Sequence, residues 1–238
     1  MTLRIALLAF VIGWCAWAAC AAPVYLGVPV SDAGSQNTIS SPNTARTVAT
    51  APDGTIFVAY HGMQGIRVAR SLNYGGTFLP SVQVTTVNAQ VEIAVDDNNV
   101  VYVAWRTNGN VMFSRSTDGG LTFSSPAVVC AASGSAVHMA TDAPCVYIIP
   151  QNGTVLFVNG SSGAGPFVSC NTGATGVFSD VQVDPATHKV YVLTDNGQLH
   201  YCVSADRGQT FGPVMTPGGF TQFTAFALSA GSAGAHAF

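Results

Sequence analysis

The sequence predicts an all-β protein, a β-propeller of four-stranded blades, and three observations carry this prediction. Four phenylalanines recur at spacings of 45, 44 and 44 residues: Phe78, Phe123, Phe167 and Phe211. Three of them close the same eight-residue phrase, which reads SLNYGGTF, STDGGLTF and SADRGQTF. Between the phrases, short β-rich runs alternate with clusters of Gly, Asn and Asp, as in hairpins. A period of this length containing four strands is typical of a propeller blade.

Each period contains short runs of Val, Ile and aromatic residues, and each run is predicted as a strand. The first period predicts residues 46–50, 55–60, 66–71 and 81–85, and the second predicts 91–95, 100–105, 111–116 and 127–130. The fourth predicts 180–183, 189–194, 199–204 and a strand from Val214 onward. The third period is degenerate. Its predicted strands are 137–141, 146–149 and 155–158, and its predicted turn at residues 160–167 keeps Phe167 but lacks the Ser, Asp, Gly and Thr of the phrase.

The two ends of the chain predict an incomplete propeller, with about four recognisable blades plus the start of a fifth. Residues 221–228 have the pattern of a first strand, but residues 229–238 are rich in Ala, Gly and Ser and do not complete that blade. Residues 24–30 are predicted as a lone strand, of the kind that completes the last blade of a closed propeller. We therefore expect a fragment of a longer propeller or an isolated degenerate copy. Its open sheet edge and apolar inter-blade face would favour association.

The first residues have the features of a targeting segment. Arg4 precedes an apolar run without charge at residues 5–19, and Ala19 and Ala21 form an A-x-A cleavage site. The run is shorter than the roughly 20 residues that span a membrane. We predict a signal peptide at 1–21, with lipidation of Cys20 as the alternative. Residues 22–44 are then a lead-in segment, residues 45–238 are the propeller, and the mature chain is secreted or periplasmic.

Four cysteines follow the leader: Cys130, Cys145, Cys170 and Cys202. An even number in an oxidising compartment is consistent with disulfides, and four cysteines allow three pairings. Buried free thiols that pack as small apolar residues are an equally good interpretation. The sequence leaves these alternatives open.

The charge of the chain excludes one class of partner. Charged residues make up 8% of the chain, and removal of Arg4 leaves seven basic against eleven acidic residues. The sequence contains no run of Lys or Arg, whereas nucleic-acid binding requires clustered cations to neutralise phosphates. We therefore expect no nucleic-acid partner. The mean hydropathy of +0.37 fits strands buried between neighbouring sheets and does not fit disorder.

The repeated phrase predicts a stabilised hairpin turn. An Asp in a tight turn accepts hydrogen bonds from backbone N–H groups, a Gly adopts positive φ, Ser and Thr hydroxyls tie the strands together, and the Phe packs inward. We expect these positions to be structural rather than catalytic: Ser71, Asn73, Thr77, Phe78, Ser116, Asp118, Gly120, Thr122, Phe123, Ser204, Asp206, Gly208, Thr210 and Phe211.

These phrases resemble the Asp-boxes, or bacterial neuraminidase repeats, of sialidase-like β-propellers. Residues 116–123 and 204–211 match the box fully, and residues 71–78 have Asn73 in place of the Asp. The resemblance covers roughly residues 45–216. It implies a propeller fold with the boxes on the outer rim, away from the catalytic face. It implies little about activity, because many propellers with such boxes are not sialidases.

A sialidase needs three arginines for the substrate carboxylate, a Tyr nucleophile activated by a Glu, and an Asp as acid and base. By this resemblance, Arg46 lies in the region of the first arginine, but it lacks the flanking Ile and Pro. Glu92 is the only Glu in the chain. The later blades, which would carry the other arginines and the Tyr, are missing or degraded. The catalytic candidates are therefore weak, and they are Arg46, Glu92 and Asp180.

Alignment of the periods places four polar residues near the start of the innermost strands: Arg46, Glu92, His138 and Asp180. Innermost strands line the central channel of a propeller, so these side chains are candidates for a ligand site for a sugar or peptide. The alternative is that positions lining a wet channel simply tolerate polar residues. The five histidines have no metal-ligand spacing, and no metal or cofactor is implied.

The sequence leads to two hypotheses of function. The first is a secreted, non-catalytic Asp-box propeller that binds glycan or extracellular protein, with association through its open edge. The second is the N-terminal portion of a sialidase-type glycoside hydrolase, an exo-α-sialidase. A scaffold without a ligand is the remaining interpretation. Fold resemblance cannot decide among them, because one architecture hosts many functions.

Overall fold

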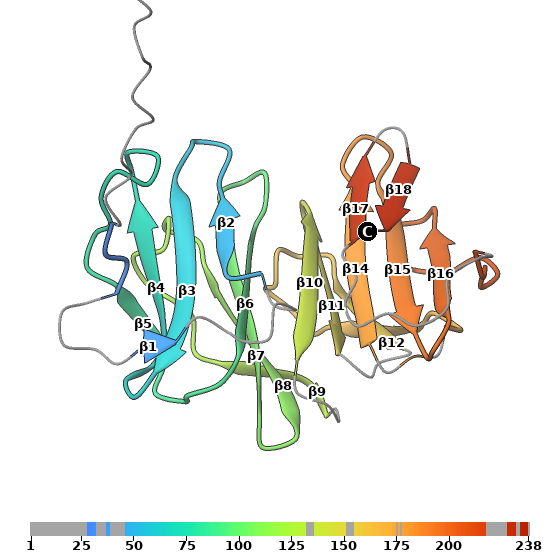
Figure 1. The fold of residues 1–238 in the computed structure, drawn as a ribbon, viewed down its shortest axis with the longest axis horizontal. Helices are drawn as coiled ribbons and strands as arrows, with labels where there is room; N and C mark the ends of the chain where they lie inside the picture. The colour runs from blue at the N-terminus through green and yellow to red at the C-terminus, as the bar shows by residue number, and fades with distance from the viewer. Residues whose placement is uncertain are drawn as a thin grey trace, which may run out of the picture.

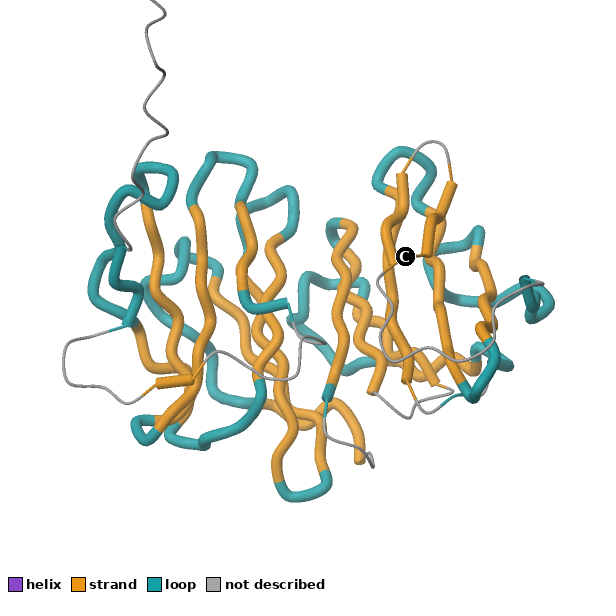
Figure 2. The backbone as a smooth tube through the Cα atoms, viewed as in Figure 1, coloured by secondary structure: helices purple, strands orange, loops and turns teal. Residues whose placement is uncertain are grey.

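The computed structural model describes residues 28–31, 37–38, 46–131, 136–150, 155–174, 176, 178–217, 228–231 and 234–237. The predicted signal peptide and most of the lead-in segment lie outside these residues. Within the described part of the chain all regular structure is β-strand, and Figure 2 accordingly draws strands and loops only. None of the described residues belongs to a helix long and apolar enough to cross a membrane.

The strands form antiparallel sheets of consecutive chain segments (Figure 1). The first sheet holds β1 (Asn37–Thr38), β2 (Val48–Thr50), β3 (Ile56–Gly62), β4 (Gly65–Ser71) and β5 (Val82–Thr85). The second holds β6 (Val91–Val95), β7 (Val101–Thr107), β8 (Asn110–Ser116) and β9 (Ala127–Ala131). The third holds β10 (Val137–Asp142), β11 (Cys145–Pro150), β12 (Val155–Asn159) and β13 (Val168–Asn171). The fourth holds β14 (Phe178–Asp184), β15 (Lys189–Asp195) and β16 (Leu199–Ser204), and β17 (Leu228–Gly231) pairs with β18 (Gly234–Ala237).

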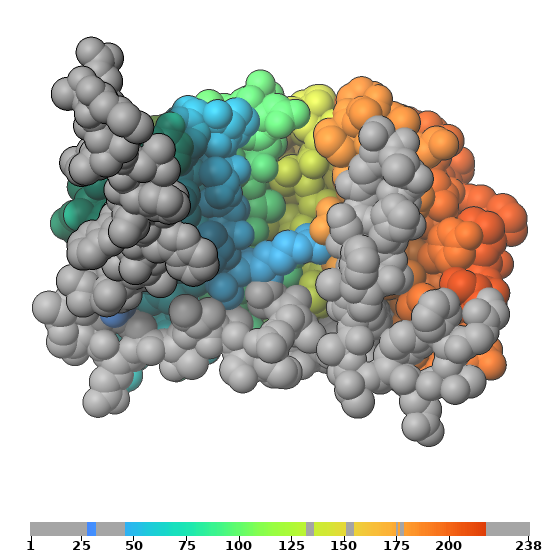
Figure 3. All heavy atoms as spheres, turned by 45° about the horizontal axis from the view of Figure 1, so that its top comes forward, coloured from blue at the N-terminus to red at the C-terminus, as the bar shows by residue number. Residues whose placement is uncertain are grey.

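The sheets pack on one another in chain order. β6 contacts β2 and β3 of the first sheet, β10 contacts β6 and β7, and β14 contacts β10 and β11. Figure 3 shows the same succession, with blue, green, yellow and orange segments crossing the visible face in turn. The first strands of successive sheets are therefore neighbours, although they lie far apart along the chain.

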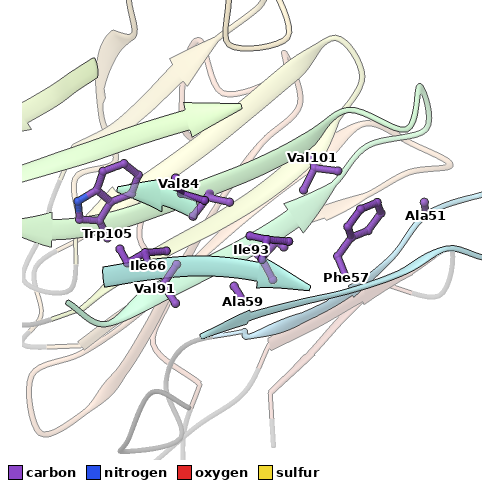
Figure 4. Packing of buried hydrophobic residues seen from close by; sticks show 11 residues of the cluster. Ala51, Phe57, Ala59, Ile66, Val84, Val91, Ile93, Val101 and Trp105 are labelled. Carbon is purple, nitrogen blue, oxygen red and sulfur yellow. The ribbon is translucent and has the colours of Figure 1, made fainter. Parts of the chain in front are cut away.

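Each pair of sheets encloses a hydrophobic core. Figure 4 shows the core between the first two sheets, a cluster that runs from Trp105 beside Ile66 to Phe57 near Ala51. Strand β7 supplies two cores at once. Val101, Val103 and Trp105 face the first sheet, whereas Tyr102 and Ala104 face the third. Because alternate residues of a strand point to opposite faces, burial on both sides produces a continuous apolar run.

The three repeated phrases fold into the same turn, which comes directly after the third long strand of its sheet. In the second sheet, Ser116 Oγ accepts a hydrogen bond from Gly120 N at 2.8 Å and donates one to Asp118 Oδ1 at 2.7 Å. Asp118 also accepts from Thr122 N at 2.9 Å and from Thr122 Oγ1 at 2.6 Å. The equivalent bonds recur around Ser204 and Asp206, and around Ser71 with Asn73 replacing the Asp.

The third turn keeps this geometry without keeping the sequence. Asn159 occupies the position of the Ser, and its Oδ1 accepts from Gly163 N at 2.9 Å, as the serine hydroxyls do in the other turns. Its Nδ2 donates to the carbonyls of Gly165 and Pro166. The fourth and fifth positions of all four turns have positive φ: Tyr74 and Gly75, Gly119 and Gly120, Ser162 and Gly163, and Arg207 and Gly208. The sequence predicts this turn at residues 160–167 without the polar positions of the phrase, whereas the turn begins one residue earlier, at Asn159, which supplies equivalent hydrogen bonds.

Most predicted strands match the observed ones within two residues, but the ends differ. Residues 28–30, the described part of the lone strand predicted at 24–30, are not in a strand. No fourth strand begins at Val214 within the described residues, where Met215 makes only an isolated bridge with Tyr201. The expected first strand at 221–228 lies almost wholly outside the described residues. The Ala/Gly/Ser-rich residues 229–238 were expected not to complete a fifth blade. Their described part forms most of the two-stranded pair β17–β18, and β17 lies against β14.

Candidate functional site

The four polar residues singled out on the innermost strands come together in space. Arg46 lies two residues before β2, Glu92 on β6, His138 on β10 and Asp180 on β14. Arg46 Nη2 is 2.7 Å from Asp180 Oδ1, and its Nη1 is 3.5 Å from Glu92 Oε1. Figure 3 shows the blue segment that leads into β2 crossing the green and yellow sheets towards the orange one. We call these four residues the central network.

Both terminal nitrogens of the Arg46 guanidinium have partners within the protein. Besides the two carboxylates, Nη1 donates to the Met139 carbonyl at 2.6 Å, and Nη2 lies 3.4 Å from the Val181 carbonyl. The backbone of Arg46 also takes part, because its carbonyl accepts a hydrogen bond from Ile93 N at 2.8 Å. Arg46 is thereby held by the second, third and fourth sheets at once.

Glu92 is the buried anchor of the central network, with 0% of its side chain exposed. Its Oε1 accepts a hydrogen bond from Met139 N at 2.7 Å. Its Oε2 lies 3.3 Å from His138 Nδ1 but has no hydrogen-bond partner of good geometry among the described residues. An unsatisfied buried carboxylate oxygen is costly, so the neighbouring His138 is the group placed to compensate Oε2.

His138 is 9% exposed and lies between two carboxylates, with Nδ1 at 3.3 Å from Glu92 and 3.9 Å from Asp180. Burial lowers its pKa, but the charges of Glu92 and Asp180 and the contact with Glu92 outweigh burial and the repulsion from Arg46. The pKa of His138 is therefore raised, and the imidazolium form is favoured in the folded protein. With His138 protonated, the central network has two positive and two negative charges.

A second polar cluster, which sequence reasoning missed, lies at the other end of β10. Asp142 is buried, and its carboxylate lies 2.9 Å and 3.0 Å from His188 Nδ1 and 3.7 Å from Arg207 Nε. In the second sheet the equivalent Asp96 accepts instead from the Tyr102 hydroxyl at 2.7 Å. One sequence feature could have predicted this cluster, because an Asp recurs near the end of the first strand of each sheet: Asp53, Asp96, Asp142 and Asp184.

The carboxylates of the repeated turns, which we call the rim, are bonded within their own turns; Asp118 is exposed and Asp206 is half-buried. Burial is the largest single influence on the pKa of Asp118 and raises it, but the hydrogen bonds from Thr122, Ser116 and Leu121 together outweigh burial and lower the pKa to about 2. Hydrogen bonds from Thr210 and Ser204 lower the pKa of Asp206 to about 2 as well. A carboxylate whose charge is saturated by its own turn has little capacity left for a ligand.

Cys130, Cys145, Cys170 and Cys202 are all free thiols in the structure. Burial raises the pKa of Cys130 to about 11 and that of Cys202 to about 12, which disfavours the reactive thiolate. Among the residues that the structure describes, no three His, Cys, Asp or Glu side chains are grouped to hold a metal ion.

Comparison with known proteins shows similarity at the level of the fold. No protein-family model and no curated protein matches the sequence. A protein of unknown function from Dyadobacter fermentans superposes with a TM-score of 0.54 at 12% identity, over 85% of this chain and 77% of that one. The GH74 enzyme of Niastella koreensis superposes with a TM-score of 0.51 at 18% identity, over 69% of this chain and 23% of the enzyme. These two likenesses show a shared all-β fold.

Sialidases are also among the structural neighbours, at low identity. A Hadza microbial sialidase superposes with a TM-score of 0.48 at 18% identity, over 70% of this chain. The chain spans 45% of the length of that sialidase. A likeness this distant does not extend to the residues of an active site.

Proposed function

We propose that this chain is a secreted β-propeller-type domain of the sialidase-like kind, which binds neutral glycans at the central network without cleaving them. The succession of antiparallel sheets with adjacent first strands supports the propeller, in which such strands line a common axis. The leader at residues 1–21, followed by the lead-in segment 22–44 and the repeats at 45–238, supports export to a compartment rich in glycans.

One observation carries the non-catalytic part of the proposal. Both terminal nitrogens of Arg46 already donate to Asp180 and to the Met139 carbonyl. A sialidase arginine must instead offer its paired N–H groups to the substrate carboxylate. Freeing Arg46 would leave Asp180 and the buried Glu92 with His138 as their one nearby cation within the described residues, and breaking a buried ion pair costs about 3–5 kcal/mol. An acidic sugar would also meet both carboxylates at close range.

The same network suits a neutral, hydroxyl-rich ligand. Sugar hydroxyls both donate and accept hydrogen bonds, so they can bind beside carboxylates and a guanidinium without changing the net charge. Arg46, at 34% exposed, is the member that reaches solvent, and Asp180, at 10%, is the carboxylate bonded directly to it. Glu92, with 0% of its side chain exposed, lies behind them and next to His138. We therefore assign ligand contact to Arg46 and Asp180, and positioning to Glu92 and His138.

The alternative function is that of a sialidase-type glycoside hydrolase of which this chain is the N-terminal portion. The convergence of Arg46, Glu92 and Asp180 at one point favours it, because a sialidase gathers an arginine and carboxylates in this way. Its activity would require Arg46 to exchange its partners for the substrate.

A glycan array probed with the full chain tests the proposal, with isothermal titration on the best ligands. We expect neutral oligosaccharides to bind and sialosides to bind less well. Asp180→Asn should weaken binding by roughly tenfold or more, as expected for the loss of a charged hydrogen bond. Asp97→Asn, on an exposed turn, is the matched control and should bind as the parent does.

Hydrolysis of a fluorogenic sialoside separates the two functions. The binding proposal expects no turnover above the background of the substrate alone. Turnover that disappears in Arg46→Ala would establish the hydrolase and overturn the proposal. Equal binding by the parent and by Asp180→Asn would show that glycans, if bound, lie elsewhere.

A further inference from the structure

Successive sheets are joined by one contact that repeats along the molecule. The fourth and fifth residues of each repeated turn after the first pack against the sheet that precedes it in the chain. The fifth residue is always a glycine, and a Cβ placed on it would lie very close to an aromatic ring of the preceding sheet. The distances are 2.8 Å from Gly120 to Phe57, 2.6 Å from Gly163 to Phe113 and 3.1 Å from Gly208 to Tyr147.

The fourth residue of the turn contacts the preceding sheet as well. Arg70 of the first sheet donates to the Gly119 carbonyl at 2.9 Å, and Arg115 of the second donates to the Ser162 carbonyl at 2.5 Å. In the fourth sheet the side chain of Arg207 itself reaches back to Asp142 of the third. The glycine and its neighbour therefore form a socket, which is filled by a ring and braced by a polar contact.

Among the described residues, the socket of the first sheet receives no such ring. A Cβ placed on Gly75 would meet, within this part of the chain, only Ile56 of its own sheet, at 3.8 Å. Tyr74, the fourth residue of this turn, is 82% exposed, whereas Gly119, Ser162 and Arg207 are half-buried. Exposure of Leu72 is not informative, because the second position of every turn is exposed.

The last ring of the series lies at the opposite end. Tyr191 on β15 corresponds to Phe57 and Tyr147, because each follows the residue that pairs with the first residue of the phrase. Tyr191 is half-buried against Leu193, Leu199 and Tyr201 of its own sheet. The pair β17–β18 lies against β14 rather than supplying a further turn of this kind. Within the described residues, no turn glycine follows to receive Tyr191.

We propose that a second copy of this chain fills the socket, with Tyr191 of one copy packing on the turn at Tyr74 and Gly75 of the next. The first and fourth sheets lie at opposite ends of the row of sheets in Figure 1, so among the described residues the two halves of the contact do not meet. The chain carries both halves of this contact, the ring of Tyr191 and the turn at Gly75. A second copy would therefore bind through the same ring-on-glycine contact that joins successive sheets within one chain. Such a contact is head-to-tail, and it closes into a ring or continues as a filament.

Sedimentation velocity of the full chain over a wide range of concentrations tests the proposal. We expect reversible self-association. Tyr74→Glu places a charge in the socket, and Tyr191→Ala removes the ring, so each should weaken association about ten- to hundredfold, as for buried aromatic anchors. Leu72→Glu adds the same charge to the same turn outside the socket, and it should associate as the parent does.

A mixing experiment distinguishes head-to-tail contact from any symmetric one. The Tyr74→Glu variant keeps an intact Tyr191 end, and the Tyr191→Ala variant keeps an intact socket. An equimolar mixture should therefore form a dimer that neither variant forms alone. A parent that stays monomeric at every concentration, equal loss in Leu72→Glu, or a mixture without dimer would each overturn the proposal. Circular dichroism checks that each variant is folded. If Tyr191→Ala is unstable, Tyr74→Glu still tests the proposal, because Tyr74 is 82% exposed and its substitution should not affect folding.

Discussion

The centre and the rim of this molecule use the same chemical groups in opposite ways. At the rim, Asp118 and Asp206 are exposed or nearly so, and their partners lie within four residues of them. At the centre, Glu92 and Asp180 are buried, and their hydrogen-bond partners in other sheets lie 47 and 134 residues away. A rim carboxylate stabilises one turn, whereas a central carboxylate holds several sheets together. The difference shows that burial and sequence separation decide what a carboxylate does for the fold.

Removal of the Glu92 carboxylate should have the largest effect. Glu92→Ala strips Met139 N of its acceptor and leaves His138 and Arg46 with one carboxylate fewer, so we expect a loss of about 3–5 kcal/mol in the free energy of unfolding. Glu92→Gln keeps an acceptor for Met139 N and should lose clearly less. Urea unfolding followed by circular dichroism measures both. Equal stability of Glu92→Ala and the parent would show that the central network contributes nothing to the fold.

At the rim, a single turn should respond more weakly. Ser116→Ala removes the acceptor for Gly120 N and the donor to Asp118, and Ser116 is 1% exposed. We expect a loss of about 1–2 kcal/mol, typical of a buried backbone N–H left unpaired. A loss as large as that of Glu92→Ala would contradict the distinction between rim and centre. The same urea titration decides it.

The third turn offers a sharper test of the rim. Asn159→Ser restores the first residue of the repeated phrase, yet it removes the two bonds from Nδ2 to the carbonyls of Gly165 and Pro166. We therefore expect a loss of roughly 1 kcal/mol rather than a gain. A rise in melting temperature would show that the phrase itself, and not the local hydrogen bonding, sets the stability of this turn.

The dependence of stability on pH should separate the two regions. The pKa of His138 is raised, so its contribution is fully present below the ordinary histidine pKa and is lost as pH rises through the folded value. The pKa of Asp118 and of Asp206 is lowered to about 2, so their contributions are present above the ordinary carboxyl pKa and are lost as pH falls towards 2.

Urea midpoints measured across pH check both directions. His138→Gln should flatten the alkaline side of the profile, and Asp118→Asn should flatten the acidic side. Identical profiles for the parent and His138→Gln would remove His138 from the account of the central network.

The sequence predicted the rim and the strands well because their determinants are local. Alternation of apolar residues marks each strand, and the phrase around Asp118 contains all the groups that close its turn. The third turn was predicted at residues 160–167, but its hydrogen bonding was missed because Asn159 replaces the Ser and accepts the same bond through a different atom. Alignment of the periods also predicted that Arg46, Glu92, His138 and Asp180 share a position. It could not predict that Arg46 is neutralised, which depends on contacts between three sheets.

Arg46 has a further consequence, for the cooperativity of unfolding. A stack in which each sheet touches only its neighbours behaves as a linear array, and its ends can open independently of its middle. Arg46 enters the first sheet through β2 but forms its shortest ion pair with Asp180 of the fourth. This single side chain bridges the first and fourth sheets of the succession. We expect local opening at either end to break the Arg46–Asp180 ion pair, so this residue couples the unfolding of the first sheet to that of the fourth.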